Sequence, residues 1–97
     1  MTRFTLSPRA QADIEDIWNI SVERFGVDRA EGYLRDIHGA IDALASDPRR
    51  GRGCEDIREG YFKFPVGSHF LFFRLIPEGI DVVRILHAGM NFEWHMP

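Results

Sequence analysis

Residues 7–28, with the sequence SPRAQADIEDIWNISVERFGVD, decide the fold because they specify one helix, its end and the start of a second helix. Ser7 followed by Pro8 is a typical helix start: the serine side chain can cap free backbone N–H groups, and proline already has a helical φ. Apolar residues then recur at helical spacing along one stripe, and Gly26 is the expected C-terminal stop. We therefore predict a helix from Pro8 to about Phe25.

A second amphipathic helix follows after a connection of only two residues, Gly26 and Val27. Asp28 is its predicted N-cap, with Glu31 three residues later as in a capping box, and the apolar stripe ends before Asp47. So short a connection permits only an antiparallel helical hairpin. The apolar faces of both helices must then be buried against another layer.

The second half of the chain changes from helical to extended periodicity. Residues 49–60 are rich in Arg and Gly without an apolar period, which predicts a surface loop. Aromatic and β-branched runs follow at 61–66, 69–75 and 80–86, separated by the turn signals Gly67-Ser68 and Pro77-Glu78-Gly79. With a short first strand at residues 3–6, this predicts an α+β domain of order β-α-α-β-β-β. The hairpin should cover one face of a small, mainly antiparallel sheet, leaving its edges and open face to bind another chain.

The composition bounds the class of protein. The 97 residues, of which 44% are hydrophobic and 28% charged, predict a single globular domain over 1–97. Apolar stretches fall far short of the roughly 20 residues of a membrane span, and residues 1–4 lack a secretory apolar region, so we expect a cytoplasmic protein without membrane contact. One cysteine, Cys54, fits a reducing compartment. The net charge of -3, with a basic excess only at 48–63, argues against direct nucleic-acid binding.

No motif for metal, nucleotide or nucleophilic chemistry is present in the sequence. HExxH, paired CxxC, a Walker loop and GxGxxG are missing, and the four His residues are scattered, so we expect no metal site and no cofactor. Ser68 lies in a tight turn next to His69, and because a neighbour in sequence along a strand points to the opposite face, we do not expect a Ser-His hydrolase. A solvated helix face is the interpretation for Asp13, Glu15, Asp16 and Asp36. We predict no catalytic set.

Two groups of residues remain as candidates for binding. The first comprises basic and His side chains on the predicted sheet: Arg58, Lys63, Arg74, Arg84 and His87. Because Arg74 and Arg84 interrupt apolar runs, each either forms an ion pair, for example with Asp81 or Asp56, or presents a guanidinium to a phosphate or carboxylate. The second group lies on the helices and is either core or anchors a partner helix: Trp18, Phe25, Tyr33 and Ile37.

Four segments, in order, resemble the ParE branch of the RelE/ParE superfamily, the toxins of type II toxin-antitoxin systems. They are FTLSPRAQADIEDIW at 4–18, DPR at 47–49, GY with PVGSH within 60–69, and IDVVRILH at 80–87. The resemblance covers nearly the whole chain and implies two helices on a small antiparallel sheet. It also implies a ParD-type antitoxin, which binds operator DNA through a ribbon-helix-helix domain and wraps the toxin in a hetero-oligomer. Free toxin of this branch inhibits DNA gyrase, for which it needs no hydrolytic chemistry.

Roles for the two groups follow from this resemblance. We expect the target to meet Arg58, Arg74, Arg84 and His87, and the antitoxin to meet Trp18, Phe25, Tyr33 and Ile37. The competing RelE-like branch cuts messenger RNA on the ribosome, and here His87 would be the base with Lys63, Arg74 and Arg84 as cations. The segment after His87 is AGMN at 88–91, so Ala88 stands directly after this His where ParE-like chains often carry a basic or amide residue, which weakens the ribonuclease alternative. An inactive homologue that only binds is a third possibility.

Overall fold

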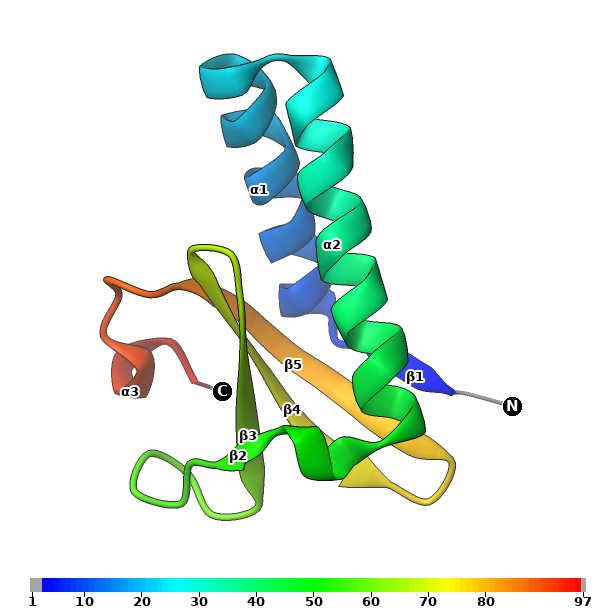
Figure 1. Ribbon diagram of the computed structural model, residues 1–97. Helices are drawn as coiled ribbons and strands as arrows, with labels where there is room; N and C mark the ends of the chain where they lie inside the picture. The colour runs from blue at the N-terminus through cyan, green and yellow to red at the C-terminus, as the bar shows by residue number, and fades with distance from the viewer. Residues whose placement is uncertain (1–2, 97) are drawn as a thin grey trace.

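A computed structural model describes residues 3–96 as a helical hairpin laid across a five-stranded sheet (Figure 1). The elements are β1 (Phe4–Leu6), α1 (Pro8–Phe25), α2 (Val27–Ser46), the 3₁₀ turn η1 (Pro48–Arg50), β2 (Arg52–Gly53), β3 (Tyr61–Val66), β4 (His69–Ile76), β5 (Gly79–His87) and α3 (Phe92–His95). The predicted order of strands and helices is confirmed. Three short elements among the described residues, η1, β2 and α3, were not predicted.

The ends of the helices follow the local sequence signals with one exception. Ser7 Oγ accepts a hydrogen bond from the Ala10 N–H at 3.0 Å, and Gly26 ends α1 at a φ of 87°, as predicted. The predicted N-cap Asp28 is wrong, because α2 already begins at Val27 and has no side-chain cap. Gly26 serves both helices, since its positive φ reverses the chain within a single residue.

The sheet has the order β1-β5-β4-β3-β2. Strands β3, β4 and β5 form the predicted antiparallel meander, while β1 runs parallel to β5 at one edge and β2 pairs antiparallel with β3 at the other. The surface loop predicted at residues 49–60 is therefore only partly correct. It contributes β2 as an edge strand and buries Cys54 to 1% exposure.

Apolar residues fill both faces of the sheet. The helix-facing core is built from α1, α2 and alternate strand residues, including Ile17, Ile37, Leu44, Leu71, Phe73 and Val82. The opposite face is occupied by a second cluster formed by Cys54, Phe72, Val83, Leu86 and Met96, with Phe92 packed against it. This face is therefore not open as expected, because the 54–57 loop and α3 contribute side chains that cover part of it.

The hairpin is longer than the sheet is wide. Helices of 18 and 20 residues are roughly 27–30 Å long, and their connected end projects beyond the β3–β4 turn (Figure 1). Within residues 3–96, neither helix is long and apolar enough to cross a membrane. The projecting end leaves a space between the hairpin and the tip of the β3–β4 turn, and the candidate site lies there.

Candidate functional site

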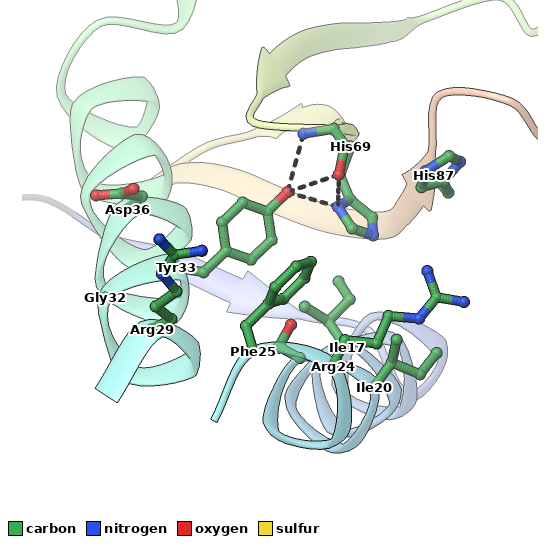
Figure 2. A pocket seen from close by; sticks show the side chains of 12 residues that line it. Ile17, Ile20, Arg24, Phe25, Arg29, Gly32, Tyr33, Asp36, His69 and His87 are labelled. Carbon is green, nitrogen blue, oxygen red and sulfur yellow. Dashed lines mark hydrogen bonds between the residues drawn. The ribbon is translucent and has the colours of Figure 1, made fainter. Parts of the chain in front are cut away.

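A pocket of about 840 Å³ lies between the projecting end of the hairpin and the β3–β4 turn, and we call it the groove (Figure 2). It is lined by Ile17, Ile20, Ser21, Arg24 and Phe25 of α1, Arg29, Gly32, Tyr33 and Asp36 of α2, and Ser68, His69 and His87 of the sheet. Ile20 and Phe25 are 51% and 59% exposed. Exposed apolar side chains beside a hollow of this size are typical of a surface that binds another molecule.

The wall of the groove is built by Tyr33, which fastens α2 to the β3–β4 turn. Its hydroxyl accepts a hydrogen bond from the Ser68 N–H at 3.0 Å and lies 2.6 Å from His69 Nδ1 and 3.2 Å from the Val66 carbonyl (Figure 2). Gly67 allows this approach, because a Cβ on it would lie 2.3 Å from the Tyr33 ring and its φ is +57°. The turn is therefore held against the helix by both packing and hydrogen bonds.

Two histidines form the floor of the groove where β4 meets β5. The His69 and His87 rings lie edge to face with centroids 5.4 Å apart. Burial lowers the pKa of His69, and the neighbouring His87 lowers it further, so His69 is neutral at pH 7. The Gly89 N–H donates to His87 Nδ1 at 3.1 Å, so Nδ1 is the acceptor and Nε2 carries the ring N–H.

The Ser68 and His69 side chains are closer than the sequence predicted. Ser68 lies in the predicted turn before β4, and its Oγ reaches to 3.5 Å from His69 Nδ1 instead of pointing to the opposite face. The same nitrogen is 2.6 Å from the Tyr33 hydroxyl, which is the shorter contact. His69 is therefore engaged by Tyr33 and is not positioned as a base for Ser68.

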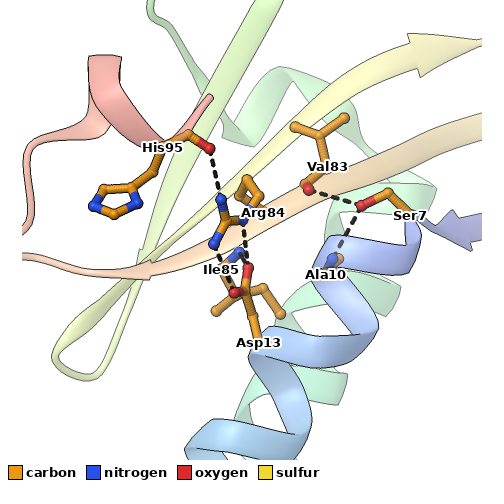
Figure 3. Close-up of polar contacts among 7 residues, drawn as sticks. All are labelled: Ser7, Ala10, Asp13, Val83, Arg84, Ile85 and His95. Carbon is orange, nitrogen blue, oxygen red and sulfur yellow. Dashed lines mark hydrogen bonds and ion pairs between the residues drawn. The ribbon is translucent and has the colours of Figure 1, made fainter. Parts of the chain in front are cut away.

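Arg84 forms an ion pair with Asp13 that links β5 to α1, and we call this arrangement the clasp (Figure 3). Arg84 Nε and Nη2 each donate to an Asp13 oxygen at 2.8 Å, and Nη1 donates to the His95 carbonyl at 2.6 Å. Asp13 also accepts from the Ile85 N–H at 2.9 Å. The bond to Asp13 raises the pKa of Arg84. The predicted solvated position of Asp13 is wrong, since both side chains of the pair are only 11% exposed.

The remaining basic candidates do not form one patch. Arg74 pairs with Asp81 at 3.0 Å, as the ion-pair alternative predicted, and Arg58 lies 6.0 Å from the centre of a tyrosine ring. Lys63 sits over the rings of the second core cluster. Asp81 and His87 are six residues apart on β5, or roughly 20 Å, so Arg74 and His87 lie near opposite ends of the sheet. The side chains suggested for a ribonuclease therefore do not converge on a common point.

The helix residues proposed as antitoxin contacts have three different positions. Phe25 and Tyr33 line the groove. Trp18 is half-buried and is not among the lining residues. Ile37 is 1% exposed in the helix-facing core, so its side chain cannot reach a partner in this structure. Several lining residues, Ile20 among them, were not predicted from the sequence. Their position in the groove depends on how elements distant in the sequence pack together, and a local sequence pattern carries no information on that packing.

No group of three or more possible metal ligands occurs within the described residues 3–96.

The family model described as ParE toxin of type II toxin-antitoxin system, parDE, matches residues 4–92. Toxin ParE1 of Mycobacterium tuberculosis is 53% identical over 93 residues, or 95% of each chain, and Toxin ParE1 of Caulobacter vibrioides is 38% identical over 96 residues, or 99% of each. A solved structure described as "Chromosomal ParDE TA system from P. aeruginosa" shares the fold, with a TM-score of 0.77 and 21% identity over 90% of this chain and 96% of that one. The chain belongs to the ParE toxin family of type II toxin-antitoxin systems.

Proposed function

We propose that this toxin inhibits DNA gyrase in the cytoplasm and is neutralised by a ParD-type antitoxin that occupies the groove. The observation that carries the antitoxin half is the groove itself, where Ile20 and Phe25 remain exposed beside the buried Ile17. A small monomer rarely leaves large apolar side chains around a hollow unless a partner covers them. The solved structure with the same fold is described as a ParDE system, which supports a partner of that type.

The shape of the groove suits an amphipathic helix. Its walls are two helices and a turn, so a third helix can place apolar side chains at i, i+3, i+4 and i+7 against the hairpin. The β5 edge beyond residue 82 is already occupied by α1, since Ser7 Oγ donates to the Val83 carbonyl and the Ile85 N–H donates to Asp13, so we place an extended antitoxin segment along another side of the sheet. Phe25 and Tyr33 are the contacts we retain from the helices, while Ile37 belongs to the core.

The assignment of gyrase as the target rests on the family resemblance, in which free ParE toxin acts by binding and not by hydrolysis. The scattered positions of Lys63, Arg74 and His87 support binding over catalysis, since RNA cleavage needs a base and cations around one phosphate. Arg58 and Arg74 are exposed and remain candidates for the target contact together with His87. Arg84 is part of the clasp, so we remove it from the target surface.

Purified toxin added separately to a gyrase supercoiling assay and to a translating extract tests the target. We expect supercoiling to stop while messenger RNA stays intact. Normal supercoiling together with cut message would instead identify a ribonuclease, and harmless high-level expression would identify an inactive homologue. Reversing the charge of Arg58 or Arg74 should reduce toxicity and leave antitoxin binding measurable.

Copurification with a co-expressed ParD-type antitoxin tests the antitoxin half of the proposal. Two exposed apolar residues at the hairpin turn provide a matched pair of variants: Phe25 lines the groove, whereas Val27, 49% exposed, does not. We expect Phe25→Gln to weaken binding by at least tenfold and Val27→Gln to leave it nearly unchanged. Equal effects of the two substitutions would place the antitoxin elsewhere on the hairpin.

A further inference from the structure

One end of the groove is basic and consists of groups that donate hydrogen bonds. Arg24, in the last turn of α1, directs its guanidinium toward the side of the groove where His87 lies (Figure 2). Within residues 3–96, Arg24 makes no hydrogen bond or ion pair. His87 adds an Nε2–H donor, because its Nδ1 already accepts from Gly89. The Arg24 guanidinium and the His87 Nε2–H therefore face the same opening, and within the described residues neither has a hydrogen-bond acceptor there.

His69 lies beneath this end of the groove, with its ring edge to face with that of His87. Its Nδ1 lies 2.6 Å from the Tyr33 hydroxyl, so this nitrogen is engaged by Tyr33 and does not point into the groove as a free group. In the part of the chain that the structure describes, the acidic residue that lines the groove is Asp36, which comes from α2 and lies beside Arg29 on the opposite side (Figure 2). The charge on the α1 side of the groove is thus uncompensated.

We propose that Arg24 and His87, with His69 beneath them, form a carboxylate site that receives an Asp or Glu side chain of the antitoxin helix. This inference rests on the proposed function, because it assigns the chemistry of the same partner. A guanidinium presents two parallel N–H groups that match the two oxygens of a carboxylate. The apolar side chains of Ile20 and Phe25 directly beside the basic end favour a peptide helix with one acidic position over a free phosphate.

A simpler role for Arg24 is to offset the negative end of the α1 dipole. That role would change stability by a few tenths of a kcal/mol and would not depend on any partner. It would also leave the affinity of the antitoxin unaltered. Measuring affinity and stability on the same variants therefore distinguishes the two roles.

The test is a set of double-mutant cycles on the full-length toxin and a full-length, co-expressed ParD-type antitoxin. Each Asp and Glu in the C-terminal half of the antitoxin is changed to its amide and measured against Arg24→Gln. The matched control is Arg9→Gln, because Arg9 is exposed on the same helix but does not line the groove. We expect Arg24→Gln to weaken binding by about fivefold to tenfold and to reduce its salt dependence, with one acidic position coupled to it.

Additive effects at every acidic position, or an equal loss from Arg9→Gln, would overturn the carboxylate site while leaving antitoxin binding intact. Inorganic phosphate that binds wild-type toxin at submillimolar concentration, but not Arg24→Gln, with no coupled antitoxin residue, would assign the site to a phosphate ligand instead. Wild-type toxin that does not bind the antitoxin at all would overturn both this inference and the antitoxin half of the proposed function.

Discussion

Replacing Asp13 by Ala should destabilise this toxin more than any other single change to its charged residues. Among residues 3–96, the substitution leaves the Arg84 guanidinium, 11% exposed, with only the His95 carbonyl as an acceptor, and it removes the acceptor of the Ile85 N–H. A buried charge that loses its partner is costly because it has been removed from water without compensation. The effect should therefore exceed that of losing an ordinary surface ion pair.

The magnitude follows from the degree of burial. Breaking a buried ion pair by removing one partner costs about 3–5 kcal/mol, and the slight exposure of this pair places it at the lower end, about 3 kcal/mol. A domain of this length has a free energy of unfolding of about 5–15 kcal/mol, so the loss is a large fraction of it. The melting temperature should fall by roughly 12–24 °C. Adding Arg84→Met to the Asp13→Ala variant should recover part of the loss, because the second change removes the orphaned charge.

Urea denaturation followed by circular dichroism measures these differences directly. The control is Arg74→Met, which removes an ion pair of the same type with Asp81 in which the Arg74 side chain is 52% exposed, and it should cost less than about 1 kcal/mol. If Asp13→Ala costs no more than Arg74→Met, or if the double variant is simply additive, the clasp does not stabilise the fold in the way described.

Three further outcomes are expected. Ile37→Ala should cost about 2–5 kcal/mol of unfolding free energy because Ile37 is buried, whereas Phe25→Ala should leave the melting temperature nearly unchanged and weaken antitoxin binding; the opposite result would reverse their assignments. Tyr33→Phe should cost about 1–3 kcal/mol by urea denaturation, because the Ser68 N–H loses its acceptor, and no loss would mean that water replaces the hydroxyl. Burial lowers the pKa of His69 from its ordinary 6.5, so the unfolded chain binds this proton more readily than the folded chain. The free energy of unfolding should therefore fall as the pH drops below 6.5 and level off below the folded-state pKa. His69→Asn should flatten that part of the pH profile.

The parts of the fold that were predicted correctly depend on local patterns. A Ser-Pro start, a helical stripe and a glycine stop define α1 within 20 residues, and the turn at 67–68 separates two aromatic strands. Each of these signals depends on residues that are close together in the sequence, so the sequence alone is enough to predict these helix ends and this turn. The prediction of Asp28 as a cap was wrong because Gly26 alone reverses the chain and occupies the N-cap position, so Asp28 lies inside the first turn of α2.

The site was harder to predict because its residues meet only after the layers pack. Asp13 and Arg84 are 71 positions apart, and Tyr33 and Ser68 are 35 apart. Helical spacing placed Asp13 off the apolar stripe of α1, which usually means solvent. Here the first turns of α1 instead run beside β5, so the carboxylate accepts from a strand N–H and from an arginine that the strand supplies.

Arg84 and Arg24 have roles opposite to those suggested by their surroundings in the sequence. Arg84 interrupts an apolar strand and seemed the better ligand-binding cation, yet it holds α1 to β5 through the clasp. Arg24 lies in an ordinary helix turn and faces the groove. The clasp fixes the first half of α1, and Tyr33 fixes α2 to the β3–β4 turn. The walls of the groove therefore already have their positions in the free toxin. A partner helix therefore has to order mainly the exposed side chains at the rim, such as Arg24 and Phe25, which lowers the entropy lost on binding.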